Sequence, residues 1–462
     1  MTNITKSKTR EIIDDFVIEI QNRKKTGHKP ATTVIDFRDD QNVGRERNIE
    51  LVPIGLLRYR KDNGRIASDI ASYEHFSSVL NEISKEDQKK IRDFLWEKDP
   101  EKTSELLNSI QHLGQKEPTI ITCDGFLING NRRKMVMEEL LKPFPNNEKY
   151  KNIKVVILPG KNDEGGPPTL LEIEQLENRY QYYSEGKAEY YGFDRAISMR
   201  RKFGVGMNLR EQMKDDPQFA NLDEKDFKKE LKKTTADFLY PLDCVDRYLS
   251  YLGRDFLYDT ISKGREGRWE AFKDYSKFYQ QLKDEKKRVK FGISEEEVGN
   301  IEDVAFKIIR KRDLQISRKV HDIMRDLPKL ITNKDSRKEL LKIKKIDLTL
   351  PKDECLDKDG NEYDVLEIDR KWGKKNAETI IRQVKKATDL LDYKNIKEKP
   401  INLLEDALDK LNHKEMNPEN INISDIPKAM QSTDDIQSRA KELRSEFYHY
   451  KKESKKLNKK FK

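Results

Sequence analysis

The order of patterns between residues 103 and 158 constrains the fold of this chain more than any other feature. Apolar residues recur at helical spacing in two places, and short β-rich runs stand between and after them. Thr103 or Ser104 is expected to cap the first helix, and Gly114 to end it. We expect, in order, a helix over 106–113, a strand over 119–122, a tight turn at 124–125, a partner strand over 126–128, a helix over 131–141 and a buried strand over 155–158.

The remainder of the chain is predicted to be helical. Its 462 residues suggest roughly three domains. Charged residues (38%) outnumber hydrophobic ones (35%), which favours small helical domains with large solvated faces. We therefore predict an α+β protein. Its expected parts are a polar N-terminal arm over 1–47, an α/β domain over 48–165, a helical region over 169–290, a helical extension over 291–350 and a C-terminal helical domain with a basic tail over 365–462.

Several helices in the second half have clear signatures. Ser294 and Glu297 have the spacing of a capping box. Two further amphipathic helices are expected in the last domain, and the apolar stripe of each is typical either of intramolecular core or of a self-association surface. The stripes are Ile380, Ile381, Val384, Ala387 and Leu391, and then Leu404, Ala407, Leu408 and Leu411.

The charge distribution points to a basic C-terminus. The net charge is +9, and from Lys441 onward nine basic residues face only three glutamates. Such a tail is typical of a nucleic-acid-contacting arm or of a solvated, self-repelling end. The three cysteines lie far apart and predict neither disulfides nor a zinc site. No apolar run is long enough for a membrane span, so we expect a cytoplasmic protein without a membrane partner.

An anion site is predicted where the second helix of the α/β unit begins. Gly130 allows close approach of a ligand, because no Cβ shields its backbone. The helix start offers backbone N–H groups and the positive end of the helix dipole. Arg132 and Arg133 add guanidinium groups that match phosphate oxygens.

The stretch from Leu106 to Leu140 resembles the N-terminal domain of ParB-type proteins, within the ParB/sulfiredoxin superfamily. That family has a helix ending in glycine, a proline before a strand, a hairpin, and a Gly-Glu-Arg-Arg motif that opens a helix. In register are Ser109, Ile110, Gly114, Pro118, Gly130, Arg132 and Arg133. The resemblance implies that residues 48–165 bind the triphosphate of a nucleotide, CTP or ATP. Asn131 replaces the motif's glutamate, so neither hydrolysis nor a preference for CTP can be carried over.

Two further resemblances extend the expected site. Glu177 and Asn178 are similar to the start of the family's Glu-Asn-x-Gln-Arg element, although the Gln-Arg does not align. This implies Glu177 as a catalytic residue for nucleotide hydrolysis and Asn178 as a ligand of Mg²⁺, a cation that prefers oxygen donors. Arg65 lies where the family places a nucleotide-contacting arginine. No cysteine lies in 130–133, so sulfiredoxin chemistry is not expected.

The helices after the α/β domain follow it as the DNA-binding helices do in ParB proteins. Thr234 is expected to cap the recognition helix of a helix-turn-helix, and Lys232, Lys233, Thr234 and Arg247 are expected to contact DNA. Such contacts would be mostly to phosphate and therefore salt-dependent. Aspartates on the same helix favour the alternative, a helical bundle with solvated charges.

Three hypotheses remain open from the sequence. The first is a ParB-like, nucleotide-dependent DNA-binding protein, expected to be a homodimer and nucleoid-associated, in which nucleotide and Mg²⁺ switch the conformation on DNA. The second is a nucleotide-hydrolysing, nuclease-like or phosphotransferase enzyme of this fold, in a DNA-modification or phage-defence system. The third is a non-enzymatic protein with a relic pocket that docks a partner through its C-terminal helices.

Overall fold

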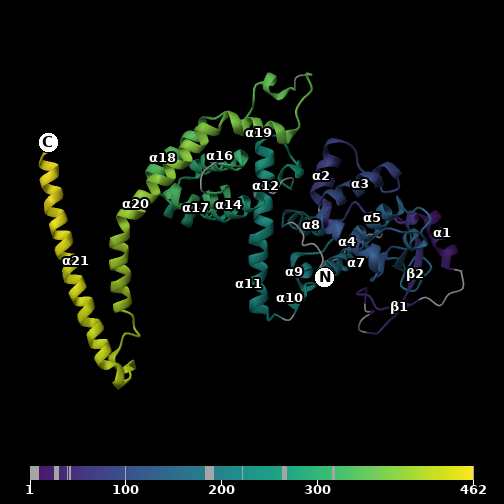
Figure 1. Cartoon of the computed structure of the whole chain (residues 1–462), viewed down its shortest axis with the longest axis horizontal. Helices are drawn as coiled ribbons and strands as arrows, with labels where there is room; N and C mark the ends of the chain where they lie inside the picture. Colours follow the sequence, from purple (N-terminus) through teal and green to yellow (C-terminus); the bar gives the residue numbers. More distant parts are fainter. Residues whose placement is uncertain are drawn as a thin grey trace, which may run out of the picture. The chain divides into compact units, whose positions relative to one another are not determined.

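The computed structural model describes residues 10–24, 31–38, 40, 43–98, 100–182, 192–220, 222–262, 268–314, 318–357 and 359–460, with backbone alone at 23–24, 181–182, 217, 220 and 455–460. A small mixed sheet near the N-terminus is followed by a largely helical region (Figure 1). This confirms the predicted α+β fold class. The chain divides into two units, Met1–Thr388 and Asp389–Lys462.

Within the described residues the sheet has four strands in the order β1-β2-β4-β3. Strand β2 is antiparallel to both β1 and β4, whereas β3 and β4 are parallel. A parallel pair needs a crossover connection, and helices α5 and α6 lie in it. The elements are β1 (Thr32–Thr33), β2 (Arg47–Pro53), β3 (Thr119–Ile121), β4 (Asn152–Ile157), α5 (Asn131–Leu141) and α6 (Glu148–Lys151). The strands predicted over 119–122 and 155–158 are thus confirmed.

Alternate side chains around β4 belong to two different hydrophobic cores. Ile153 and Val155 pack in the core that includes α5, whereas Val156 and Leu158 pack on the other side. Successive strand residues point to opposite faces, so a strand buried on both sides has a continuous apolar sequence. The first core also holds residues of α2 (Ala67–Phe76), α3 (Lys85–Lys98) and α4 (Pro100–Leu113), and the second holds residues of α7 (Leu170–Tyr182).

The connection between β3 and α5 is a tight bend. Gly125 has a φ of +85°, and the Thr122 N–H donates to the Phe126 carbonyl at 2.9 Å. A single antiparallel bridge, Ile121 with Leu127, follows the bend. The predicted turn at Asp124–Gly125 is confirmed, but the partner strand predicted over 126–128 is reduced to isolated bridges, of Phe126 with Arg58 and of Leu127 with Ile121.

The described part of the N-terminal arm packs on the sheet and the helices around it, which are together called the sheet unit below. Helix α1 (Asp14–Lys24) buries Ile20, and β1 pairs with β2. The Arg10 guanidinium lies 2.7 Å from the fully buried carboxylate of Asp124 and 3.5 Å from the centre of the Phe126 ring. These residues therefore belong to the α/β unit.

Helices make up most of the rest of the chain. They are α8 (Gly192–Gly204), α9 (Leu209–Lys214), α10 (Pro217–Ala220), α11 (Glu224–Thr234), α12 (Tyr240–Tyr251), α13 (Asp259–Ser262), α14 (Arg268–Lys283), α15 (Glu285–Lys290), α16 (Glu295–Lys311), α17 (Val320–Thr332), α18 (Lys334–Leu340), α19 (Val365–Lys375), α20 (Ala377–Leu411) and α21 (Ile426–Lys460). Short 3₁₀ turns are η1 (Ile54–Leu56), η2 (Gly64–Ile66), η4 (Leu341–Lys345), η5 (Lys352–Cys355), η6 (Pro418–Asn420) and η7 (Ile423–Asp425). The predicted capping box of Ser294 and Glu297 is present at the start of α16.

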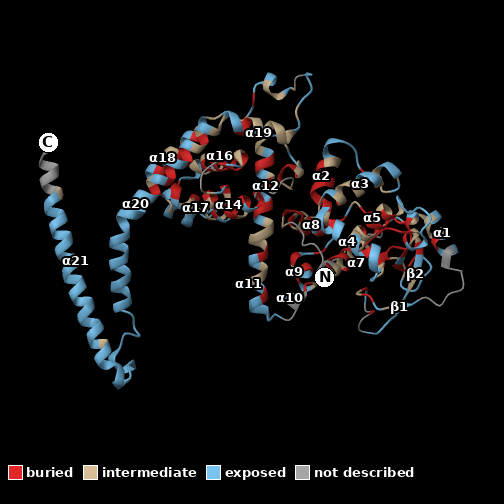
Figure 2. Ribbon diagram, viewed as in Figure 1, coloured by how far each residue is buried: buried red, intermediate tan, exposed pale blue. Residues whose placement is uncertain are grey.

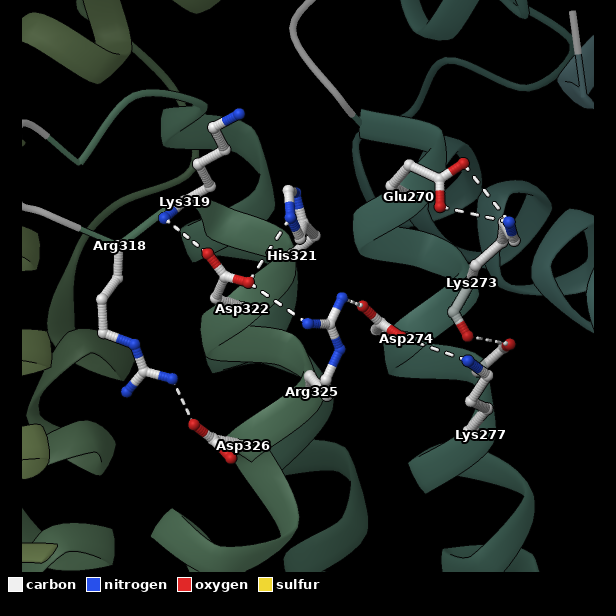
Figure 3. Close-up of polar contacts among 11 residues, drawn as sticks. Glu270, Lys273, Asp274, Lys277, Arg318, Lys319, His321, Asp322, Arg325 and Asp326 are labelled. Atoms are coloured by element: carbon white, nitrogen blue, oxygen red, sulfur yellow. Dashed lines mark hydrogen bonds and ion pairs between the residues drawn. The ribbon is translucent and has the colours of Figure 1, made fainter.

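Arg325 of α17 forms an ion pair with α14 at the exposed edge where the two helices pack (Figure 3). Its Nη2 atom lies 2.9 Å from Oδ2 of Asp274 on α14, and its Nη1 atom lies 3.3 Å from Oδ1 of Asp322 on its own helix. The Arg325 side chain is 61% exposed, so these ion pairs add little stability. Buried apolar residues of both helices, such as Phe278 and Leu327, carry the packing instead.

A buried ionic cluster connects α19 to the other helices. Asp369 is fully buried and accepts from Arg254, Arg268 and Arg310 at 2.8, 3.0 and 2.9 Å. Burial alone would raise the pKa of Asp369, but Arg268, Arg254 and Arg310 together lower it to about 2. One carboxylate therefore holds three segments that are far apart in the sequence.

Two helix starts predicted from the sequence are wrong. Helix α4 begins at Pro100 rather than at Thr103 or Ser104, and proline is favoured in the first turn of a helix. Thr234 has helical dihedral angles (φ −59°, ψ −42°) and makes no capping hydrogen bond. Helix α11 instead runs through the π-helix η3 (Thr235–Leu239) into α12, so no turn separates them.

Helix α20 is a single helix of 35 residues where the sequence predicts two. Its first stripe is core, since Ile380, Val384 and Ala387 are fully buried. Its second stripe is exposed, with Leu404 at 44% and Leu408 at 58%. The part of α20 from Asp389 onward and all of α21 belong to the unit Asp389–Lys462. From Asp392 to Glu453 the residues are exposed or half-buried (Figure 2).

Candidate functional site

Gly130 lies immediately before α5 in a left-handed conformation, with a φ of +83°. A Cβ added to it would lie 2.6 Å from Oγ1 of Thr119 on β3. Glycine is therefore required here both by the backbone conformation and by the contact with the strand. Thr119 fills the space that a side chain would take, so a ligand at this helix end would approach from another side of Gly130.

Two buried polar atoms beside this helix end have no hydrogen-bond partner among the described residues. They are Oγ1 of Thr119 and Oδ1 of Asn131. Thr119 is fully buried, and Asn131 is 8% exposed. A buried polar group without a partner costs about 1–3 kcal/mol. The first turn of a helix also presents N–H groups that have no intrahelical acceptor, at the positive end of the dipole. A bound anion would satisfy these donors.

The two arginines of the predicted motif begin the same helix. Nη2 of Arg133 lies 2.5 Å from Oε2 of Glu117, and its Nη1 donates to the Pro118 carbonyl at 3.2 Å. Burial lowers the pKa of Arg133, and Glu117 opposes this effect. Glu117 is 70% exposed, so it is a partner that a stronger anion can replace. Arg132 is partly buried on the same turn.

Glu177 and the segment that contains Arg65 lie next to each other. The buried carboxylate of Glu177 accepts from the Gly64 N–H at 3.2 Å and from Nη1 of Arg60 at 3.4 Å. Gly64 begins η2, in which the Arg65 N–H donates to the Asn63 side chain at 2.9 Å. Burial raises the pKa of Glu177, and the neighbouring Glu174 raises it further. The structure thus joins Glu177 to the backbone next to Arg65.

Asn178 is engaged by protein groups at both ends of its amide. Its Oδ1 accepts from the Lys202 ammonium at 2.7 Å, and its Nδ2 donates to the Gln212 carbonyl at 3.0 Å. No cluster of three or more acidic, histidine or cysteine side chains able to hold a metal occurs among the described residues. The donors around Asn178 therefore do not fit the Mg²⁺ that the resemblance implies, because an ion there would first have to displace Lys202.

Sequence reasoning missed the cations that surround Glu177. Nη2 of Arg60 lies 3.0 Å from Glu174, and Arg201 of α8 lies 2.7 Å from the same carboxylate. Lys202 is the next residue after Arg201, and burial lowers the pKa of Lys202 to about 8. The available signal was the spacing of Glu174, Glu177 and Asn178, which places three polar side chains on one face of α7 that is buried.

The residues predicted to contact DNA have different surroundings. Lys232 and Lys233 are exposed on α11, and Lys233 pairs weakly with Glu230 at 3.5 Å. Thr234 is buried within the continuous helix. Arg247 makes a two-point contact with Glu302 of α16 at 2.8 and 2.5 Å and lies over the Tyr279 ring. Arg247 therefore packs α12 on its neighbours in this structure.

A surface hollow of about 400 Å³ lies away from these residues. Its lining comes from α3 and from the other end of α5, and it includes none of the predicted site residues. The lining residues are Lys90, Arg92, Asp93, Phe94, Trp96, Glu97 and Glu139.

The fold and the site define an α+β protein with two features. Buried polar atoms beside the start of α5 lack hydrogen-bond partners among the described residues, and α7 carries a buried ionic cluster. Comparison with protein-family models, with curated proteins and with solved structures gave no significant match. The resemblance to ParB proteins therefore rests on the quoted motifs alone. None of the described helices is both long enough and apolar enough to cross a membrane.

Proposed function

We propose that this protein is a nucleotide-responsive DNA-binding protein that holds the phosphates of CTP or ATP at the N-terminus of α5. The observation that carries this proposal is the pair of unpartnered buried atoms beside that helix end, Oγ1 of Thr119 and Oδ1 of Asn131. A phosphate oxygen would accept from the Thr119 hydroxyl and from N–H groups of the first helical turn. Rotation of the Asn131 amide would turn its NH₂ group toward the same oxygens.

The arginines of α5 would complete the phosphate contacts. Arg133 would exchange the exposed Glu117 for a phosphate, with which a guanidinium forms paired hydrogen bonds. Arg132, on the same turn, is the second arginine of the motif. Any Mg²⁺ would enter with the nucleotide, where it would neutralise phosphate charge, since Asn178 is occupied by Lys202.

A shared carboxylate supports communication between the sheet unit and the helices that follow. Glu174 on α7 binds Arg60, which comes from the sheet unit, and Arg201, which comes from α8. All three groups are largely buried, so a shift of either arginine would be costly unless the other moved with it. A ligand that binds one arrangement better than another would shift the balance between them.

Helix α11 offers the surface that we assign to DNA. Lys225, Lys229 and Lys232 follow one another at helical spacing on one face, are exposed, and make no ion pair with any described residue. Lysines of this kind bind DNA phosphates with a strong dependence on salt. Of the residues that the sequence predicts to contact DNA, Lys232 lies on this surface.

DNA affinity measured by fluorescence anisotropy, with and without CTP or ATP, tests the whole proposal. Nucleotide is expected to change the affinity, and replacing Lys225, Lys229 and Lys232 by Gln should lower it and reduce the salt slope by roughly one for each lysine. The control replaces Lys286, Lys287 and Lys290 of α15, which are also exposed. Equal affinity for all proteins, with no effect of nucleotide, would exclude this function.

Hydrolysis of the nucleotide is a second proposal, which the environment of Glu177 favours. Burial raises the pKa of this carboxyl, which moves it toward the range useful for proton transfer at neutral pH. Release of phosphate from CTP or ATP that stops in Glu177→Gln, with nucleotide affinity unchanged, would support a catalytic role. Binding without any turnover in the wild-type protein would leave Glu177 as a positioning residue.

A further inference from the structure

Four exposed cations lie on one side of helix α21 without an acidic residue beside them (Figure 2). They are Lys441, Arg444, Lys451 and Lys452, which are called the basic stripe below. At 3.6 residues per turn they fall within about a third of the helix circumference. On a helix the neighbours of a residue are those three and four positions away, and for all four cations these are neutral or basic. None of the four forms an ion pair with a described residue.

The glutamates of the same part of α21 lie on the opposite side of the helix. They are Glu442, Glu446 and Glu453. Arg439 lies on their side as well, and it pairs with Glu442 at 2.9 Å and with Glu446 at 3.2 Å. Charges that only keep a helix in water are usually interleaved, because pairs of opposite sign stabilise the helix. Separation of the two signs leaves the basic stripe uncompensated, as a surface for an anionic partner requires.

A shallow surface hollow of about 470 Å³ lies along the basic stripe. Its lining residues are Lys441, Arg444, Ser445, Phe447, Tyr448 and Lys451. Every polar side chain in this lining can donate a hydrogen bond, and none of them is a carboxylate. Phosphate oxygens accept hydrogen bonds from Lys, Arg, Ser and Tyr side chains alike. Tyr448 is 66% exposed, so its hydroxyl is open to a partner. The lining therefore has the chemistry of a surface for phosphate groups.

We propose that the basic stripe of α21 binds the phosphate backbone of double-stranded DNA, as a second surface that is separate from α11. The choice of DNA as the anionic partner rests on the function proposed above. Double-stranded DNA carries about one negative charge per 1.7 Å of its axis, so a line of cations on successive helical turns meets several phosphates at once. Contacts to phosphate carry no sequence information. The stripe therefore adds affinity and salt dependence but no sequence preference.

The arrangement of charges around α21 favours DNA over an anionic membrane. Helices that lie in a membrane surface carry Lys and Arg across the polar face that borders their apolar face. On α21 the apolar residues Leu443, Phe447 and Tyr450 have the basic stripe along one edge and Glu446 along the other. A membrane that covered the apolar residues would therefore set Glu446 against anionic headgroups. DNA can contact the stripe from one side and leave the glutamates in water.

Fluorescence anisotropy with a labelled DNA duplex, measured over a range of salt concentrations and without nucleotide, tests the stripe in the full-length protein. Replacing Lys441, Arg444 and Lys451 by Gln should weaken binding about tenfold or more. It should also lower the salt slope by roughly one for each residue replaced. Gln is a good helix former and the three positions are exposed, so the circular dichroism of the variant should match that of the wild-type protein.

The matched control replaces three exposed lysines of α20 in the same unit by Gln, namely Lys394, Lys397 and Lys399. It removes the same charge and should bind DNA as the wild-type protein does. A stripe variant that binds like the wild type, or a control that is weakened equally, would overturn the inference and leave the α11 surface to its own variants. Loss in the stripe variant but not in the α11 variant would retain the stripe and reject α11, whereas a wild-type protein that binds no DNA would overturn both. Loss of binding to duplex RNA or to phosphatidylserine vesicles, with DNA binding unchanged, would assign the stripe to that partner instead.

Discussion

Nη2 of Arg60 lies 3.0 Å from Oε1 of Glu174, and both side chains are at most 5% exposed. The pair joins the loop between η1 and η2, which follows β2, to helix α7. Removing one member of a buried pair leaves an uncompensated charge, which costs about 3–5 kcal/mol. Arg60→Met is therefore expected to lower the free energy of unfolding in urea by an amount in this range.

The control for Arg60→Met is an exposed pair of the same length. Nη2 of Arg45 lies 3.0 Å from Glu164, but the two side chains are 46% and 84% exposed. Arg45→Met should cost less than about 1 kcal/mol, since water screens such pairs. Equal effects at the two positions would show that the buried pair does not hold the sheet unit to α7.

Gly130 allows the contact with Thr119 to be tested separately from backbone strain. Gly206 has a similar φ of +88°, but an added Cβ there would meet nothing within 4 Å. Gly206→Ala is expected to cost about 1–2 kcal/mol from the left-handed backbone alone. Gly130→Ala should cost more in urea unfolding, because its Cβ also meets Thr119. Adding Thr119→Ala should recover part of the excess, and costs that simply add would argue against the contact.

The Asp369 cluster predicts a loss of stability in acid. The pKa of Asp369 is lowered to about 2, from an ordinary value near 3.8. The unfolded chain therefore takes up a proton before the folded one, and the stability that Asp369 contributes above pH 4 is lost as the pH falls from about 4 toward 2. Asp369→Asn should be destabilised by about 3–5 kcal/mol at neutral pH and should lack this part of the acid dependence. Asp392→Asn, at an exposed position, should behave like the wild-type protein.

The buried Lys202 predicts a further rise of stability with pH, in the alkaline range. Burial lowers its pKa to about 8, so between pH 8 and 10.5 the unfolded chain holds a proton that the folded one has lost. Stability from this group therefore rises with pH across that window, by at most ~3.5 kcal/mol at about 1.4 kcal/mol per pKa unit. The difference in unfolding free energy between wild type and Lys202→Met isolates it. A difference that is constant from pH 8 to 10 would show that Lys202 remains protonated throughout.

The sequence predicted those features of the fold that leave a local trace. The strand β4 was visible because both of its faces are buried, and the α16 start because a capping box lies within four residues. The sequence predicts two helices in place of α20 because its apolar residues form two separate stripes, whereas the helix continues through Pro400. Thr234 has the chemistry of a cap, but the chain continues from α11 through a π-helix.

The site was less predictable because its contacts join distant parts of the chain. Gly130 to Arg133 could be placed at a helix start from the turn before them. The partners of Glu177 could not, since Arg60 is 117 residues away in the sequence. Likewise the Lys202 contact with Asn178, which decides whether that amide is open to a metal, has no local signal. Such polar contacts arise from packing, and only the folded chain reveals them.

Calorimetric titration of the full-length protein with CTP, ATP and GTP tests the central claim, a phosphate site at the start of α5. At least one of these nucleotides is expected to bind the wild-type protein, and the double variant Arg132→Ala, Arg133→Ala should bind it at least tenfold more weakly. Glu117→Gln should not weaken binding, because it frees Arg133 from its present partner. Absence of binding by all three nucleotides, or an unchanged affinity in the double variant, would contradict the account.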